Sequence, residues 1–177
     1  MHSTEKATEI AKKIKLLILD IDGVLTDGGI YFDDTGKELK KFNSLDGHGI
    51  NMLLSSGIEV GVITARSTSS VSYRLKDLGV KHYYHGISDK SITLTELTDK
   101  LSIELSQVCY VGDDVIDLAV MTKVALPIAV ANAHSFVKEH SILVSEKCGG
   151  SGAVREVCDF LLKSQGKYDA LMESYLK

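Results

Sequence analysis

Predominantly apolar runs alternate with amphipathic segments along most of the chain. The runs are rich in Leu, Ile and Val, which is typical of strands buried on both faces of a sheet. They cover residues 16–19, 60–63, 108–111 and 125–130. Between them lie segments with apolar residues at helical spacing, such as Leu94, Leu97 and Leu101. These predicted helices cover residues 47–56, 67–78, 90–101 and 115–122.

Strands that alternate with helices over short connections form βαβ units, and such units build parallel sheets. We therefore expect an α/β fold with a mostly parallel, Rossmann-like sheet and helices on both faces. A shorter strand over residues 81–84 and two C-terminal helices over 152–162 and 167–176 continue the pattern.

One segment departs from this alternation. Residues 28–31 and 38–42 flank the turn sequence Asp33-Asp34-Thr35-Gly36, whose glycine can take a positive φ. This predicts a β-hairpin that projects from the sheet directly after the first strand.

The composition is that of an ordinary globular protein. Hydrophobic residues make up 44% and charged residues 25% of the 177 residues, so we expect a single domain over residues 1–177. The net charge of −4 argues against a nucleic-acid partner, which needs a basic surplus. No apolar run approaches the roughly 20 residues of a membrane-spanning helix. The polar start leads into no apolar signal segment, and three cysteines without a CxxC pair indicate no disulfide framework. We expect a cytoplasmic protein.

Acidic residues gather where two of the predicted strands end. Asp20 and Asp22 follow the first strand, and Asp113, Asp114 and Asp117 follow the third. In an open α/β sheet, ligands bind at the carboxyl ends of the strands. Carboxylates brought together there repel one another unless a cation neutralises them, and hard oxygen ligands favour Mg²⁺. The pattern predicts a magnesium site, although Asp114 also fits the simpler interpretation of a solvated acid that caps a helix.

Three further residues have the chemistry of phosphate ligands. Thr64 and Arg66 place a hydroxyl and a guanidinium just after the second strand, and Lys90 begins a predicted helix. A lysine at a helix N-terminus opposes the helix dipole, so taken alone Lys90 fits a solvated surface position equally well.

The order of these residues is informative. Asp-x-Asp-Gly at 20–23, then Thr64, Lys90 and Gly-Asp-Asp-x-x-Asp at 112–117, resembles the four motifs of the haloacid dehalogenase-type phosphohydrolases. The resemblance covers nearly the whole chain. It implies an Mg²⁺-dependent hydrolysis of phosphate monoesters through a phosphorylated aspartate.

The resemblance also implies a role for each residue. Asp20 would attack phosphorus and form a covalent intermediate, which divides one hard displacement into two easier ones. Asp22 would protonate the departing oxygen and then take a proton from the attacking water. Thr64 and Lys90 would hold the phosphoryl oxygens.

The metal site follows from the same resemblance. Asp20, the backbone carbonyl of Asp22 and Asp113 would bind Mg²⁺. Asp114 and Asp117 would support these ligands without touching the ion. The positive charge of the ion would offset the negative charges of the nucleophile and the phosphate, whose repulsion is the main electrostatic obstacle to the reaction.

Other segments narrow the resemblance to the phosphatases of 3-deoxy-D-manno-octulosonate 8-phosphate, a sugar-acid phosphate of lipopolysaccharide synthesis. These segments are 20–29, Phe42-Asn43, Asp46-Gly47, 110–118, Gly149-Gly150 and 152–156. The implied substrate-binding residues, besides Asp22 and Lys90, are Asn43, Asp46, Gly47, Asn51, Arg66 and Arg74. Leu45 and Asn51 stand where the family usually has basic residues, so a related nonulosonate 9-phosphate is the alternative substrate.

Two other classes of protein share part of the pattern. A response-regulator receiver also combines an acidic pair with Asp, Thr and Lys, but its adjacent acidic pair follows the first strand. Here the adjacent pair, Asp113-Asp114, comes late, and the first strand carries Asp20 and Asp22. A noncatalytic interaction module is the other alternative, and it would be favoured had Asp20, Asp22, Lys90 or Asp113 been lost.

The gaps between the motifs leave no room for a cap domain. Residues 23–63 span 41 positions, already used by the hairpin, one helix and one strand, and residues 91–112 span 22. An uncapped site would be open to water, and the hairpin carries exposed apolar residues that neighbouring subunits could cover. The resemblance implies a homotetramer in which a neighbour's segment around residues 149–155 reaches the site.

Overall fold

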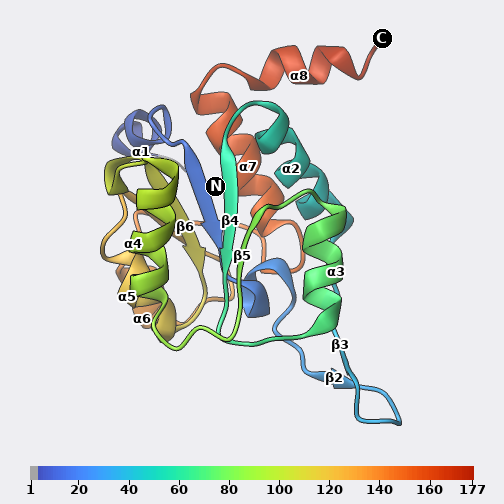
Figure 1. The fold of residues 1–177 in the computed structure, drawn as a ribbon. Helices are drawn as coiled ribbons and strands as arrows, with labels where there is room; N and C mark the ends of the chain where they lie inside the picture. Colours follow the sequence, from blue (N-terminus) through green and yellow to red (C-terminus); the bar gives the residue numbers. More distant parts are fainter. Residues whose placement is uncertain (1–3) are drawn as a thin grey trace.

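Six parallel strands form one sheet in the order β5-β4-β1-β6-β7-β8 (Figure 1). The structure, a computed structural model, describes residues 4–177, so the first three residues of the polar N-terminus lie outside it. The strands are β1 (Leu16–Leu19), β4 (Glu59–Ile63), β5 (His82–Tyr84), β6 (Val108–Gly112), β7 (Leu126–Ala129) and β8 (Leu143–Val144). The predicted α/β class with a parallel sheet is confirmed.

The centre of the sheet explains the apolar runs. All four residues of β1 are buried, and the strand pairs with β4 on one side and β6 on the other, with Leu16 opposite both Glu59 and Val108. Because helices cover both faces, neither face of β1 meets water and its side chains have no need to alternate.

Helices lie on both sides of this sheet (Figure 1). They are α1 (Glu5–Ala11), α2 (Ser44–Ser55), α3 (Ser69–Asp77), α4 (Lys90–Leu101), α5 (Leu118–Met121), α6 (Ser135–Glu139), α7 (Ala153–Ser164) and α8 (Tyr168–Ser174). On one side α2 packs against α7, beside α3, and on the other α4 packs against α5. The chain leaves β1 toward β4 and later crosses to β6, so a topological switch point lies at the end of β1, where ligands bind in such sheets.

Several predicted boundaries were wrong. Helix α2 begins at Ser44 and not at residue 47, because the side chain of Asn43 accepts a hydrogen bond from the amide of Leu45 at 2.8 Å and caps the helix. The single helix predicted over 115–122 is a short 3₁₀ turn, Val115–Asp117, followed by α5. Helices α1 and α6 and strand β8 were not predicted at all.

The hairpin is present, and it projects away from the sheet at the lower end of Figure 1. It consists of β2 (Tyr31–Phe32) and β3 (Glu38–Leu39), which pair antiparallel. These strands are shorter than predicted, because Gly28 takes a positive φ of 76° and Phe42 pairs separately with Thr26. The hairpin keeps large apolar side chains in solvent, with Phe32 62% exposed.

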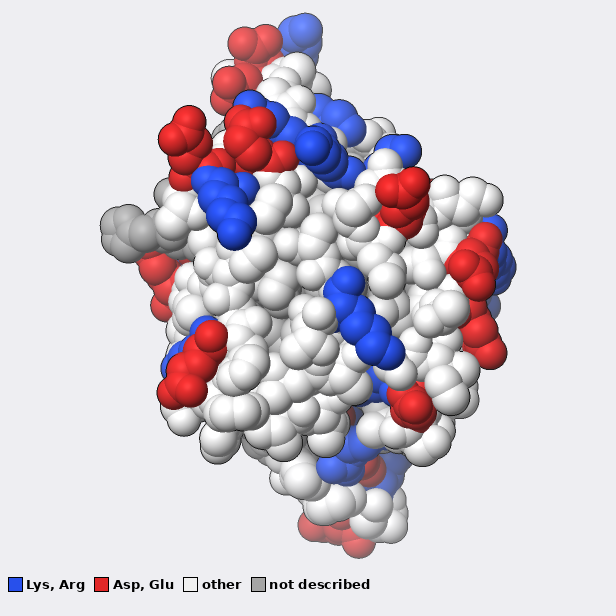
Figure 2. Space-filling view, turned by 90° about the vertical axis from the view of Figure 1, so that its left-hand side faces the viewer, with Lys and Arg blue, Asp and Glu red and all other residues white. Residues whose placement is uncertain are grey.

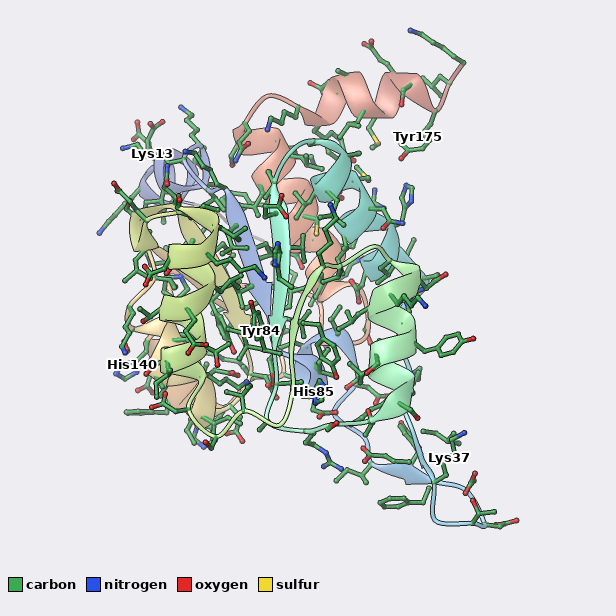
Figure 3. The ribbon with its side chains drawn as sticks, viewed as in Figure 1. Lys13, Lys37, Tyr84, His85, His140 and Tyr175 are labelled. Carbon is green, nitrogen blue, oxygen red and sulfur yellow. The ribbon has the colours of Figure 1, made fainter. Side chains whose placement is uncertain are left out.

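The hairpin and the C-terminal helix lie at opposite ends of the molecule. Figure 3 places Lys37 at the hairpin end and Tyr175 of the α8 segment at the other. On the face turned to the viewer in Figure 2, basic and acidic side chains are interspersed and do not form a field of one sign. In the described part of the chain, no helix has the length and apolar character needed to cross a membrane.

Candidate active site

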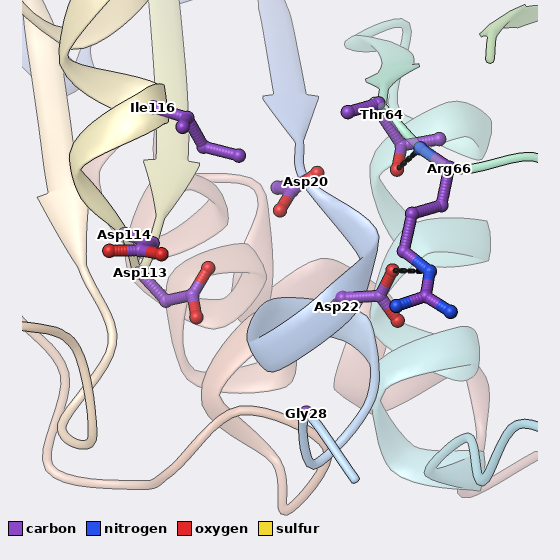
Figure 4. A pocket seen from close by; sticks show the side chains of 9 residues that line it. Asp20, Asp22, Gly28, Thr64, Arg66, Asp113, Asp114 and Ile116 are labelled. Atoms are coloured by element: carbon purple, nitrogen blue, oxygen red, sulfur yellow. Dashed lines mark hydrogen bonds and ion pairs between the residues drawn. The ribbon is translucent and has the colours of Figure 1, made fainter. Parts of the chain in front are cut away.

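Three strand ends meet at one pocket. Asp20 follows β1, Thr64 follows β4, and Asp113 follows β6, and β1 lies between the other two strands (Figure 4). The pocket has a volume of about 210 Å³ and is lined by Asp20, Asp22, Gly28, Thr64, Ala65, Arg66, Asp113, Asp114 and Ile116. The structure therefore brings together most of the residues for which the sequence predicted catalytic or metal-binding roles.

A tight turn after β1 shapes the floor of the pocket. In Ile21–Leu25 the backbone of Gly23 takes a φ of +86°, which residues other than glycine rarely adopt. A Cβ at Gly23 would also lie 2.0 Å from Asp113 Oδ2. The hydroxyl of Thr26, a residue that the sequence reasoning missed, donates to the Ile21 carbonyl and accepts from the amides of Gly23 and Gly28.

Lys90 is buried and points into the acidic cluster. It is the first residue of α4 and only 4% exposed, and its Nζ lies 2.9 Å from Asp20 Oδ1 and 2.8 Å from Asp117 Oδ1. Burial alone would lower the pKa of Lys90, but the two carboxylates outweigh it and raise the pKa above its ordinary value. These contacts compensate for the unfavourable helix dipole, so the solvated surface position is excluded.

Asp117 is fully enclosed and organises the loop after β6. Its Oδ1 accepts hydrogen bonds from Tyr110 Oη at 2.6 Å and from Lys90, and its Oδ2 accepts from the amide of Asp113 at 2.9 Å. Both oxygens are therefore in use. The sequence reasoning missed Tyr110 because it stands within an apolar strand. A tyrosine in a buried strand is nevertheless a weak sign of a buried polar partner, because its hydroxyl needs a hydrogen bond.

The carboxyl groups of Asp20 and Asp113 resist ionisation. Burial raises the pKa of Asp20 to about 6, repulsion from Asp117 adds to the effect, and Lys90 opposes it. Burial, followed by repulsion from Asp117 and Asp20, raises the pKa of Asp113 to about 7. Oxygens of these three acids lie within 4.8 Å of one another. Three carboxylates with one ammonium leave an excess of negative charge among hard oxygen donors, and this donor set fits a divalent cation such as Mg²⁺.

Asp22 belongs to a chain of ion pairs that reaches the hairpin. Lys40 donates a hydrogen bond to Asp22 Oδ1 and lies 2.7 Å from Glu38 Oε1. Glu38 Oε2 accepts a hydrogen bond of 2.8 Å from Arg66, whose Nε lies 3.8 Å from Asp22 Oδ2 (Figure 4). The sequence reasoning missed Lys40 and Glu38, because nothing in their spacing shows that these side chains reach Asp22 and Arg66.

The other residues predicted to contact the sugar lie elsewhere in this chain. Asn43 caps α2, Asn51 is exposed on α2, and Arg74 pairs with Asp77 at 2.8 Å. A Cβ at Gly47 would lie 2.2 Å from the Arg74 guanidinium, so the glycine makes room for that side chain. None of these four predicted residues is among the described residues that line the pocket.

Asp46 is buried between two helices. Its carboxylate accepts hydrogen bonds from the amide of Arg155 at 2.8 Å and from that of Gly152 at 3.3 Å, so it caps the N-terminus of α7 from α2. Burial raises the pKa of Asp46 despite these bonds. Each carboxylate oxygen of Asp46 therefore accepts one backbone hydrogen bond from the start of α7, and its predicted contact with the sugar stays a prediction.

The glycine-rich segment before α7 packs against the pocket loop of its own chain. The amide of Gly150 donates to the Val24 carbonyl at 2.9 Å. A Cβ at Gly149 would lie 1.6 Å from the Gly23 carbonyl oxygen, and one at Gly150 would lie 2.4 Å from the Asp27 amide. Within this subunit the glycines serve a close approach to the pocket loop, and the contact of this segment with a neighbour's site stays a prediction.

Comparison with known proteins gives consistent matches. The pattern of the family described as haloacid dehalogenase-like hydrolase matches residues 84–156. The chain is 52% identical over 159 residues to the 3-deoxy-D-manno-octulosonate 8-phosphate phosphatase of Escherichia coli K12, which covers 90% of this chain and 85% of that protein.

Two solved structures are similar over nearly their whole length. One is a probable phosphatase of the yrbi family from Pseudomonas syringae pv. phaseolica, with a TM-score of 0.96, 44% identity, and coverage of 98% of this chain and 99% of that one. The other is the 3-deoxy-D-manno-octulosonate 8-phosphate phosphatase of Moraxella catarrhalis in complex with a magnesium ion, a phosphate ion and a KDO molecule. Its TM-score is 0.95 at 41% identity, and the match covers 97% of this chain and 99% of that one.

Proposed function

Since this chain belongs to the haloacid dehalogenase-like hydrolases, among the 3-deoxy-D-manno-octulosonate 8-phosphate phosphatases, we propose that it hydrolyses this sugar phosphate. The products are the free sugar acid and phosphate, and the reaction belongs to the synthesis of lipopolysaccharide precursors. The observation that carries the proposal is the meeting of Asp20, Asp22, Thr64 and Asp113 in one pocket above the buried Lys90. The described residues 4–177 support the proposal of one phosphatase domain, and a cytoplasmic location stays a prediction.

Asp20 is the nucleophile of the proposed reaction. A carboxylate oxygen of Asp20 attacks phosphorus while the bond from phosphorus to the sugar oxygen breaks, and Asp22 gives that oxygen a proton. Water then attacks phosphorus, Asp22 takes a proton from it, and the bond from phosphorus to Asp20 breaks. Phosphate leaves and Asp20 is regenerated.

Two groups position the phosphoryl group. The hydroxyl of Thr64 faces the pocket at the end of β4, and its position is fixed by the backbone bonds that Thr64 makes to Tyr84 and Ile87. The Lys90 ammonium, 2.9 Å from Asp20, keeps the nucleophile in place and offers positive charge to a phosphoryl oxygen. In the proposed site the carboxylates of Asp20 and Asp113 and the backbone carbonyl of Asp22 would hold Mg²⁺, which would supply positive charge against the nucleophile and the phosphate.

Substitution of the nucleophile tests this proposal. With Mg²⁺ and 3-deoxy-D-manno-octulosonate 8-phosphate, Asp20→Asn should release phosphate at no more than a few per cent of the wild-type rate. The matched control is Asp33→Asn in the hairpin turn, which is not among the described residues that line the pocket and should keep its activity. Retained activity in Asp20→Asn would refute the assignment of the nucleophile.

The substrate itself needs a direct comparison, because Leu45 and Asn51 replace basic residues of the family pattern. Arg66 remains in the pocket and can pair with a sugar carboxylate. We expect kcat/KM to be higher for the octulosonate 8-phosphate than for a nonulosonate 9-phosphate or for a simple sugar phosphate. Equal, low values for all three would contradict the proposed substrate class.

The enclosure of the substrate is a further part of the proposal. A volume of about 210 Å³ is below the ~300–1,000 Å³ typical of small-molecule sites. The hairpin beside the pocket exposes Ile30, Tyr31, Phe32 and Leu39. We propose that hairpins of neighbouring subunits cover these side chains in a homotetramer and that a neighbour completes the site.

A further inference from the structure

The hairpin places a buried lysine beside the pocket. Lys40 follows β3, and only 1% of its side chain is exposed. Its ammonium donates a hydrogen bond to Asp22 Oδ1 and lies 2.7 Å from Glu38 Oε1. An ammonium group withdrawn from water is unfavourable unless anionic partners compensate it, so this placement depends on both carboxylates.

Asp22 is held from two sides by this arrangement. Lys40 contacts Oδ1, while Arg66 Nε lies 3.8 Å from Oδ2. Glu38 joins the two cations, because its two oxygens contact Lys40 and Arg66 separately. The four side chains alternate in charge, so each one restrains the orientation of the next. Of the two cations on Asp22, Lys40 is the buried one, whereas 43% of the Arg66 side chain is exposed.

We propose that Lys40 is a positioning residue for Asp22. It holds the Asp22 carboxyl group in the orientation from which a proton passes to the leaving oxygen and is later taken from water. The inference rests on the proposed function, in which Asp22 is the general acid and base. It also means that the hairpin, an element at the edge of the pocket, takes part in the chemistry through Asp22.

Loss of this orientation should affect substrates unequally. A sugar phosphate leaves as a strongly basic alkoxide and needs a proton in the transition state, whereas p-nitrophenolate is stable without one. General acid catalysis is worth about 10²–10⁴-fold where it is needed. A lysine that merely stabilised the fold would matter equally for both substrates, so their comparison isolates the effect on Asp22.

The experiment compares Lys40→Met, Lys40→Arg and the neighbouring control Lys41→Met. Lys41 is 67% exposed and pairs with Asp27 and not with Asp22. In Lys40→Met, kcat/KM for the octulosonate 8-phosphate should fall about 10–100-fold, and that for p-nitrophenyl phosphate by less than about threefold. Lys40→Arg should recover most of the loss, and Lys41→Met should match the wild type.

A second readout uses the sugar phosphate alone. Because Lys40 acts on the proton transfer, Lys40→Met should lower kcat and leave KM within about twofold of the wild type. Glu38→Gln removes the charge that joins Lys40 to Arg66 and should show the same selective loss, which keeps the test decisive if Lys40→Met does not fold. Equal losses on both substrates, an effect on KM alone, or an unchanged kcat would overturn the inference. A wild-type protein inactive on both substrates would instead refute the proposed function.

Discussion

Two acidic residues of the pocket, Asp20 and Asp113, ionise less readily than ordinary aspartates. Asp20 and Asp113 have pKa values of about 6 and about 7, above the ~3.9 of an unfolded aspartate, chiefly because they are buried. Between about pH 4 and about pH 7, the folded protein keeps protons on these two carboxyl groups that the unfolded chain has released. The free energy of unfolding of the metal-free protein therefore falls as the pH rises through this range.

This linkage predicts how magnesium and pH act together. Mg²⁺ replaces the protons on the carboxylates, so the rise in melting temperature that it causes should be larger at about pH 8 than at about pH 5. Thermal unfolding with Mg²⁺ or with a chelator at both pH values measures this. In Asp113→Asn the difference between the two pH values should shrink. A magnesium effect that is independent of pH, or larger in acid, would contradict the prediction.

Tyr110 gives a second prediction at this scale. Tyr110→Phe removes the 2.6 Å hydrogen bond to the buried Asp117 and leaves that carboxylate short of a donor. The expected cost is about 1–3 kcal/mol in the free energy of unfolding, measured with urea. Tyr73→Phe is the control, because Tyr73 is 84% exposed and its loss should cost less than about 0.5 kcal/mol. Equal stabilities of the two variants would show that the bond to Asp117 contributes nothing.

The sequence showed some pocket residues and not others for a physical reason. Asp20 and Asp113 could be predicted from the sequence because each directly follows a buried strand. A parallel sheet then places such acids at one edge. Tyr110 and Lys40 acquire their partners only through the fold, since Lys40 and Asp22 are 18 positions apart. The bond from the Arg155 amide to Asp46 also forms only through the fold, since the two residues are 109 positions apart.

Secondary-structure elements were likewise predicted where the signal is local in sequence and missed where it comes only from the fold. Helix α4 begins and ends where its apolar spacing predicts, and β1 coincides with its apolar run. Helix α1 was missed because Glu5–Ala11 is largely polar and buries only Ala7 and Ala11. Strand β8 has two residues, too few to show a pattern, and it forms only by pairing with the edge of β7.

The junction of α2 and α7 gives a prediction at the element scale. Asp46→Ala removes the carboxylate that accepts from the amides of Gly152 and Arg155, which leaves the N-terminus of α7 without its cap. The free energy of unfolding should fall by about 1–2 kcal/mol. Asp77→Ala, which removes an exposed acid at the end of α3, is the matched control.

Kinetics decide whether Asp46 also has the sugar contact that the family resemblance implies. A cap on α7 predicts an unchanged KM for the sugar phosphate in folded Asp46→Ala, since the carboxylate faces a helix N-terminus and not the pocket. A KM raised by about tenfold or more, with stability unchanged, would show that the side chain binds substrate instead.

At the scale of the whole molecule, the pocket lies open at the carboxyl ends of the strands, and an apolar hairpin lies beside it. Its own C-terminal helix cannot cover this edge, because α8 lies at the opposite end of the molecule (Figure 3). Its glycine-rich segment is already packed beneath the pocket loop, through the bond from Gly150 to Val24. Enclosure of the substrate by another subunit stays a proposal, and the exposed side chains of Ile30, Phe32 and Leu39 on the hairpin support it.

A charge on the hairpin should therefore separate the subunits. In the proposed tetramer Phe32 is buried between hairpins, so Phe32→Glu would place an unpaired carboxylate in an apolar contact, which is strongly unfavourable. Within one subunit the same side chain is 62% exposed, so the fold should be unaffected. Ile92→Glu on α4 is the matched control, since Ile92 is 58% exposed on an element away from the hairpin. Light scattering should find smaller species for Phe32→Glu alone. Its kcat/KM should fall at least about tenfold, which corresponds to ~1.4 kcal/mol of interaction lost with the neighbour's part of the site. A wild-type monomer with full activity would exclude a shared site, and so would a Phe32→Glu monomer that still selects the octulosonate phosphate as the wild type does.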